Sequence, residues 1–231
     1  MLRNNLPRVY ELRDLIEDPN APISHFQDFE KSILDDPRGE SKKRTWLSRE
    51  KEFQRLDKDS WEFLKKKALP YLTTKQTNGR GWEQLISILN EVRGYVYLSE
   101  VGCSRIQFIP EEGKENQRTP ELQGELDSTI VLCEVKTLFA SENEVRRRIE
   151  KKVGTIENQL CDGFFNKLIK TIEDGRGQIE AYKDEKYKAA NNVRPIVYII
   201  PNFDDFLGEY KANYYKQIDE YLVSRAVSPL I

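Results

Sequence analysis

The segment Thr129–Leu138 is the most β-prone run of the chain, and it carries two charged residues in its second half. Apolar residues from Ile130 to Cys133 lead directly into Glu134-Val135-Lys136. β-branched and apolar residues at this density predict a strand. An ionised group in a core strand costs several kcal/mol unless it is paired or binds a metal. The strand therefore has either a half-exposed face or a site that needs these two charges.

A hairpin is predicted from the segment that precedes this strand. Glu121–Leu126 forms a second, short strand, and residues 127–128 form a two-residue turn. This turn sets Glu121 directly opposite Glu134. Opposed residues share a face of the sheet with their Cβ atoms about 4.5–5.5 Å apart. Two like charges at that distance destabilise a sheet unless a cation lies between them.

The same face also carries the lysine of the second strand. Glu134 and Lys136 are two residues apart, so their side chains point the same way. The hairpin thus predicts two carboxylates and one ammonium group in one patch. Asp127 is a weaker candidate ligand because it lies in the turn, away from Lys136.

The acid-x-lysine triplet by itself carries little information in a chain with 33% charged residues. The other copies lie in predicted loops or helices, where solvated charges explain them: Glu40/Lys42, Glu112/Lys114, Glu150/Lys152, Asp184/Lys186 and Glu209/Lys211. For Glu134 and Lys136 the simplest alternative is that both face solvent. The inferred register opposite Glu121 favours a site instead.

The chain divides into a helical region, residues 1–77, and an α/β region, residues 78–231. The fold class predicted is α/β, with a small central mixed β-sheet flanked by helices and a helical N-terminal extension. Before the hairpin we expect a helix that begins at Trp82 and ends at Gly94, followed by strands at 95–98 and 104–109. After the hairpin we expect helices at 142–174 and 178–190, separated by Gly175–Gly177. A strand at 195–200, buried on both faces, and a helix at 209–224 complete the chain order.

Composition limits the metal chemistry. The chain has one histidine, His25, and its three cysteines, Cys103, Cys133 and Cys161, are far apart. A zinc site therefore lacks its usual nitrogen and sulfur ligands, and a histidine-based triad would need His25 to reach the site. Carboxylates favour hard cations, so we expect Mg²⁺, with Mn²⁺ as an alternative.

Charge and hydropathy say less about partners. The net charge is −2, and basic residues gather in short clusters, which usually form solvated helix faces but leave a backbone-binding surface open. The sequence contains no apolar run long enough to span a bilayer and no secretion signal, so a cytoplasmic location without membrane contact is expected.

Short motifs in this order resemble the PD-(D/E)XK, or restriction endonuclease-like, nuclease superfamily. They are Thr119-Pro120-Glu121 with Glu134-Val135-Lys136 in the hairpin, Gly79–Leu85 containing Glu83 upstream, and Gln178 with Tyr182 downstream. The resemblance covers about 120 residues. It implies Mg²⁺-dependent hydrolysis of phosphodiester bonds in nucleic acid, with DNA favoured over RNA.

The resemblance also implies roles for these residues. Glu121, Glu134 and Glu83 would bind metal, Lys136 would position the attacking water, and Gln178 would orient the lysine or the phosphate. Tyr182 would pack beneath them; for Gln178 and Tyr182 ordinary helix packing is an equal alternative. The helical wheel alone does not separate Glu83 from Glu91, and the family's spacing favours Glu83.

Two departures from the family pattern keep other functions open. The family usually has aspartate where this chain has Glu121, and the insertion between Thr137 and Gln178 is longer than in the simplest members. The alternatives are a catalytically degenerate nuclease-fold domain that binds nucleic acid or acts as a scaffold, and a helical interaction protein. Residues 1–77 are expected to serve target recognition, homodimerisation or docking into a larger complex.

Overall fold

The structure is a computed structural model, and it describes residues 2–35, 39–75, 81–110, 119–139, 158–187, 192–202 and 210–225. In chain order the elements are α1 (Leu2–Asn5), α2 (Pro7–Arg13), α3 (Phe29–Leu34), α4 (Gly39–Gln54), α5 (Lys58–Ala68), a 3₁₀ turn (Leu69–Tyr71), α6 (Glu83–Glu100), β1 (Ser104–Phe108), β2 (Leu122–Leu126), β3 (Thr129–Leu138), α8 (Asp162–Lys186), β4 (Val193–Pro201) and α9 (Lys211–Ser224).

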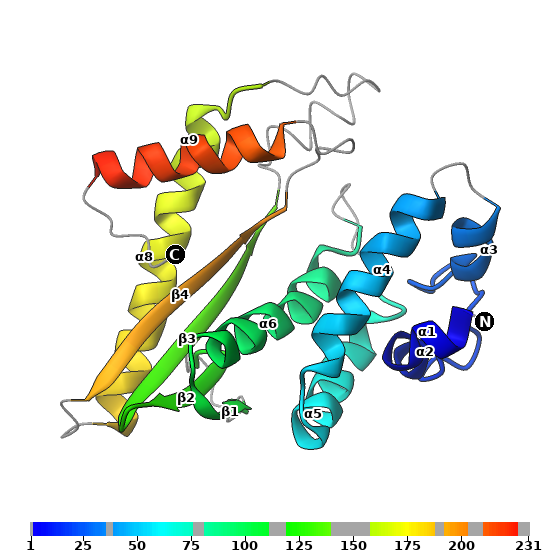
Figure 1. The fold of residues 1–231 in the computed structure, drawn as a ribbon, viewed down its shortest axis with the longest axis horizontal. Coiled ribbons are helices and arrows are strands. Elements are labelled where there is room, and N and C mark those ends of the chain that lie inside the picture. The colour runs from blue at the N-terminus through cyan, green and yellow to red at the C-terminus, as the bar shows by residue number, and fades with distance from the viewer. Residues whose placement is uncertain are drawn as a thin grey trace.

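A four-stranded mixed sheet in the order β1-β2-β3-β4 forms the centre of the α/β part. β1 pairs with β2 and β2 with β3 in antiparallel fashion, whereas β3 and β4 are parallel. A parallel pair needs a long crossover connection, and α8 lies within the one between β3 and β4. Figure 1 shows α8 on one side of the sheet, α6 on the other, and α9 crossing α8. The predicted α/β class with a small mixed sheet flanked by helices is confirmed.

Helix α6 continues through Gly94, so the expectations that this glycine closes the helix and that residues 95–98 form a strand are wrong. Gly94 is needed for close packing. A Cβ atom there would lie 2.4 Å from Cγ2 of Val135 and 3.0 Å from Cδ1 of Leu122. The missing side chain lets α6 approach β3 closely, and the tertiary contact outweighs the low helix propensity of glycine.

Helix α8 likewise runs without interruption through Gly175–Gly177, where a break was expected. Gly175 faces the opposite side of the sheet from α6. A Cβ atom at Gly175 would lie 2.8 Å from Cγ1 of Val197 and 3.4 Å from Cγ of Glu134. The odd-numbered residue Val135 therefore faces α6, and Glu134 faces α8, as the alternation of a strand requires.

Strand β4 differs from its predicted environment. It was expected to be buried on both faces, but it is the edge strand of the described sheet, and among its residues only Ile196 and Ile200 are buried. The last helix is confirmed as α9. The expected helical residues 142–157 lie outside the described part of the chain.

The N-terminal region is helical, as expected, and it shares a core with the α/β part. One hydrophobic cluster contains Phe53 and Leu64 from α4 and α5 together with Leu89 of α6 and Val135 of β3. Helices α4 and α5 are separate, because Asp57 accepts a hydrogen bond from the backbone N–H of Ser60 and begins α5. Figure 1 shows α4 between α6 and the shorter N-terminal helices.

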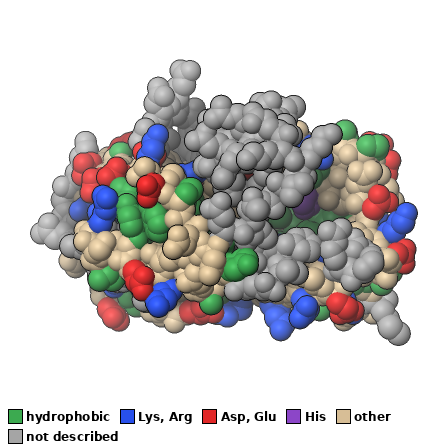
Figure 2. All heavy atoms as spheres, turned by 90° about the horizontal axis from the view of Figure 1, so that it is seen from above, with side chains coloured by type: hydrophobic (Ala, Val, Ile, Leu, Met, Phe, Trp, Pro, Cys, Tyr) green, Lys and Arg blue, Asp and Glu red, His purple; other side chains and the backbone are tan. Residues whose placement is uncertain are grey.

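Within the described residues, none of the helices is long and apolar enough to cross a membrane. In the face shown in Figure 2, acidic and basic side chains are interspersed over the described surface, without a large area of one sign.

Candidate active site

The β2–β3 hairpin has the predicted register. Leu122 pairs with Cys133, and the strands close around a two-residue turn. Both turn residues have left-handed backbones, with φ of 47° at Asp127 and 66° at Ser128. Positive φ at both positions is the geometry of the type I′ turn, whose twist suits a hairpin. One residue beyond the ladder, this register brings Glu121 level with Glu134.

Glu121 lies directly before β2 and reaches across to β3. Its carboxylate oxygen Oε2 accepts a hydrogen bond of 3.0 Å from the backbone N–H of Val135. The side chain thus supplies the acceptor for a β3 amide beyond the end of β2. This hydrogen bond holds the Glu121 carboxylate next to Val135, the residue that separates Glu134 from Lys136.

Glu134 has an exposed fraction of 0%. Its Oε1 forms an ion pair with the ammonium group of Lys136, whose side chain is 29% exposed. Among the described residues, Lys136 is the cation paired with this carboxylate, and the Glu121 carboxyl is its other polar neighbour. Burying a carboxylate is costly, and the ammonium group of Lys136 offsets part of this cost.

The electrostatics of the two carboxylates agree with this view. Burial, followed by the hydrogen bond with Glu121 and the charge of that carboxylate, raises the pKa of Glu134 to about 9, and Lys136 acts in the opposite direction. Burial lowers the pKa of Lys136, but the charges of Glu134 and Glu121 outweigh it, so the pKa is raised. Burial and the Glu121 carboxylate thus favour the protonated form of Glu134, whereas the ammonium group of Lys136 favours its ionised form.

Helix α8 covers this group and supplies Gln178. The Gln178 carbonyl oxygen accepts a hydrogen bond of 3.3 Å from Nζ of Lys136. Its amide nitrogen donates one of 2.7 Å to the backbone carbonyl of Thr119. Gln178 therefore links the lysine to the segment that carries Glu121. The sequence-predicted residues Glu121, Glu134, Lys136 and Gln178 are brought together.

Helix α8 contributes another residue that the sequence did not single out. Asp174 lies one turn before Gln178, and its charge helps to raise the pKa of Lys136. The i, i+4 spacing to Gln178 was the available signal. Tyr182, one turn after Gln178, is buried in a hydrophobic cluster with Ile179 and Leu132, which is ordinary packing of the helix against the sheet.

Glu83 does not join this group. It begins α6, eleven residues before Gly94, which corresponds to roughly 16 Å along the helix axis from the contact with Val135. The described residues include no cluster of three or more histidine, cysteine or acidic side chains that could hold a metal. The alternative, Glu91, is buried and lies 2.8 Å from Nζ of Lys67 in an ion pair.

His25 is also apart from the hairpin. Its ring packs edge-on against Trp82 and Trp46, with centroid distances of 5.0 and 6.0 Å. Burial, followed by the charge of Arg49, lowers the pKa of His25 to about 4. The histidine is therefore neutral and structural, and the exclusion of a histidine-based triad at the hairpin agrees with its position.

The residues at the hairpin fit a hard divalent cation. The ligand atoms would be carboxylate oxygens, those of Glu121 and of the buried Glu134. Mg²⁺ is commonly held by one or two protein carboxylates, with water and substrate phosphate completing its coordination, so two glutamates suffice.

Comparisons with protein-family models, with curated proteins and with solved structures found no match. Function must therefore be inferred from the chemistry of the hairpin and its surroundings.

Proposed function

We propose that this protein is a Mg²⁺-dependent nuclease of the PD-(D/E)XK, restriction endonuclease-like type, with DNA as the favoured substrate. The observation that carries the proposal is the fully buried Glu134 carboxylate, which is paired through Oε1 with the ammonium group of Lys136 and lies beside a second carboxylate, that of Glu121. The four-stranded mixed sheet between α6 and α8 is compatible with such a fold.

Glu121 and Glu134 would hold the metal. When bound, Mg²⁺ would polarise the scissile phosphate and lower the pKa of a coordinated water. Mn²⁺ offers the same chemistry with the same oxygen ligands. A role for Glu83 as a further ligand rests on the sequence resemblance alone, since the structure does not bring this residue to the pair.

Lys136 would act on the attacking water and on the phosphate. With its proton it stabilises negative charge that develops on the phosphate oxygens, and it holds the water in line by a hydrogen bond. Gln178 is a positioning residue, since it fixes the ammonium group through its 3.3 Å contact. Removing the side chain of Lys136 or of Gln178 should slow the chemical step without unfolding the protein.

The deciding experiment compares Lys136→Ala with the native protein on single-stranded, duplex and branched DNA and on RNA, with Mg²⁺ or Mn²⁺. We expect native cleavage and at least a hundredfold loss in the variant, because one lost electrostatic contact of this kind costs about that factor. Arg105→Ala, a change at an exposed ion pair on β1, is the control and should cleave normally.

Cleavage by Lys136→Ala at the native rate would contradict the assignment. Stabilisation by Mn²⁺ without cleavage of any substrate would favour the degenerate nuclease-fold alternative, a binding or scaffold module. An absence of metal-induced stabilisation would leave the hairpin as a structural element.

A further inference from the structure

A pocket of about 400 Å³ lies in the groove between α4 and α6, on the face of the sheet opposite Glu134 and Lys136. Its walls come from successive turns of the two helices, and Tyr198 of β4 completes it. Tyr198 pairs with Val135 in the β3–β4 register, and Val135 faces α6. The pocket is of the size that takes small ligands.

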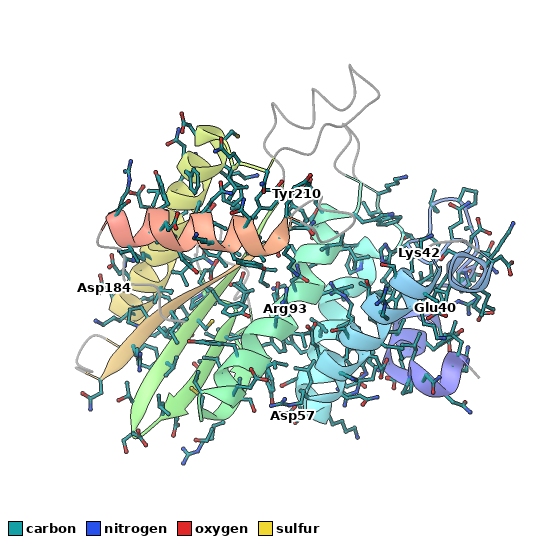
Figure 3. All side chains as sticks on the ribbon, turned by 45° about the horizontal axis from the view of Figure 1, so that its top comes forward. Glu40, Lys42, Asp57, Arg93, Asp184 and Tyr210 are labelled. Carbon is teal, nitrogen blue, oxygen red and sulfur yellow. The ribbon has the colours of Figure 1, made fainter. Side chains whose placement is uncertain are left out.

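Basic side chains from both helices line this groove. Arg93 comes from α6, and Lys51 and Arg55 come from α4; Figure 3 shows Arg93 in the region between α4 and β4. Two carboxylates, Glu52 and Glu100, are interspersed with them. The groove therefore carries one more cation than anions along its walls.

The ion pairs in the groove are loose. The closest atoms of Arg93 and Glu52 are 3.5 Å apart, and those of Arg55 and Glu100 are 3.6 Å apart. These distances exceed those of a charge-assisted hydrogen bond, about 2.7–2.9 Å. The Arg55–Glu100 pair is exposed and the Arg93–Glu52 pair is half-buried. Exposed pairs contribute little, about 0–1 kcal/mol, so a phosphate can displace Glu100 from Arg55 at small cost.

A third arginine adds to the local positive charge. Arg49 hydrogen-bonds Asn90 at 3.0 Å through Nη2, but its buried Nη1 has no partner in the described structure. Burial lowers the pKa of Arg49, Glu52 acts against this, and Arg93 lowers it further. Arg49 does not line the pocket, but the charges of Glu52 and Arg93 both act on it, so it lies close behind the groove.

Two aromatic rings line the same pocket. The ring centroids of Tyr97 and Tyr198 are 5.0 Å apart, with an angle of 31° between the planes. Flat aromatic surfaces next to cations are the arrangement by which proteins hold single-stranded nucleic acid, with bases on the rings and phosphates on the cations.

We propose that the groove between α4 and α6 binds a nucleotide unit, its base against Tyr97 and Tyr198 and its phosphate on Arg93 and Arg55. This site is separate from the hairpin because the sheet lies between them. It does not depend on the proposed hydrolysis, and it would bind whether or not the hairpin is catalytic.

A second pocket provides an internal control. It has a volume of about 310 Å³ and also contains an arginine and aromatic rings, Arg105, Phe63 and Phe108. Its other charged residues are Asp57 and Asp59, so anions exceed cations there. Asp57 is labelled at the lower edge of Figure 3, well away from Arg93.

The test is binding of a short fluorescein-labelled single-stranded oligonucleotide to the full chain, followed by anisotropy in EDTA so that cleavage does not interfere. We expect saturable binding that the double variant Arg55→Ala/Arg93→Ala weakens at least about tenfold. The slope of log K against log salt should become shallower by roughly 0.7, since one neutralised phosphate is lost. Tyr198→Leu should weaken binding at least fivefold or so.

Two further variants separate a ligand contact from a structural role. Glu52→Gln removes a carboxylate that competes with the phosphate, so affinity should rise, by up to about fivefold. Arg105→Ala in the acidic pocket should bind as the native protein does.

Competition with unlabelled adenosine monophosphate identifies the source of the nucleotide. Competition by it shows that the groove accepts free nucleotides, and binding of the oligonucleotide alone shows that it needs a strand; both results support the proposal. The proposal is overturned if neither ligand binds, if Arg55→Ala/Arg93→Ala binds like the native protein, or if Arg105→Ala weakens binding equally.

Discussion

The Glu121 carboxylate accepts a hydrogen bond of 3.0 Å from the backbone N–H of Val135, between the two charged residues of β3. The glutamate is therefore a structural acceptor for the sheet as well as a candidate metal ligand. Its extra methylene, compared with the aspartate usual in the proposed family, has a structural use: the side chain spans the gap beyond the end of β2.

Substitutions at Glu121 separate its two roles. Glu121→Gln keeps an oxygen acceptor for the Val135 N–H, so its free energy of unfolding should stay near the native value, but stabilisation by Mn²⁺ should be lost. Glu121→Asp keeps the charge and shortens the reach, so it should retain the Mn²⁺ effect and lose about 0.5–1.5 kcal/mol. Urea unfolding with and without Mn²⁺ measures both; an aspartate variant as stable as the native protein would show that the bond contributes nothing.

Glu134→Gln should stabilise the metal-free protein, and the gain should grow with pH. Because the folded pKa of Glu134 is raised to about 9, the native protein has its full stability below the unfolded pKa and loses it as pH rises towards 9. Glutamine has no proton to lose. Between pH 6 and 8 the difference in unfolding free energy should increase by about 1–2 kcal/mol, within the limit of about 1.4 kcal/mol per pH unit.

The measurement is urea unfolding of both proteins in EDTA across that range. Mn²⁺ should raise the melting temperature of the native protein alone, since the variant lacks the ligand. A difference in stability that does not change with pH would mean that Glu134 is already ionised in the metal-free protein.

Two glycines of α8, two residues apart, should respond to alanine with opposite signs. A Cβ at Gly175 meets Val197 at 2.8 Å, whereas a Cβ at Gly177 has no atom within 4 Å. Gly175→Ala should destabilise by about 1–3 kcal/mol through overpacking. Gly177→Ala should stabilise by up to about 1 kcal/mol, because alanine favours the helix. Urea midpoints of the two variants that move in the same direction would contradict the close approach of α8 to β4.

His25 should make the protein less stable in mild acid. Its folded pKa, about 4, is below the unfolded value, so the stability it contributes is complete above pH 6.5 and is lost as pH falls towards 4. Between pH 7 and 5.5 this loss is about 1 kcal/mol.

Because Glu134 changes stability in the opposite direction over that range, the comparison is with His25→Phe, which keeps an aromatic ring beside Trp82. The unfolding free energy of the native protein should fall relative to the variant by about 1 kcal/mol from pH 7 to 5.5. Parallel pH curves for the two proteins would show that His25 is protonated at no cost.

The sequence by itself determined the hairpin. Turn length and side-chain alternation are local properties, so they set the pairing of Leu122 with Cys133 and placed Glu121 near Glu134 before any packing was known. The apolar patterns also predicted the α/β class and the helical N-terminal region, because burying one face of each element requires those periods.

Tertiary packing decided the rest. Gly94 and Gly175 looked like helix ends in the sequence, but both lie within helices, since each lets a helix approach the sheet too closely for a side chain. The contact between Lys136 and Gln178 joins residues far apart in the chain, and it depends on how α8 crosses β3. The separation of Glu83 from the carboxylate pair has the same origin: the position of one rigid helix against a strand is set by the whole core, and no local pattern records it.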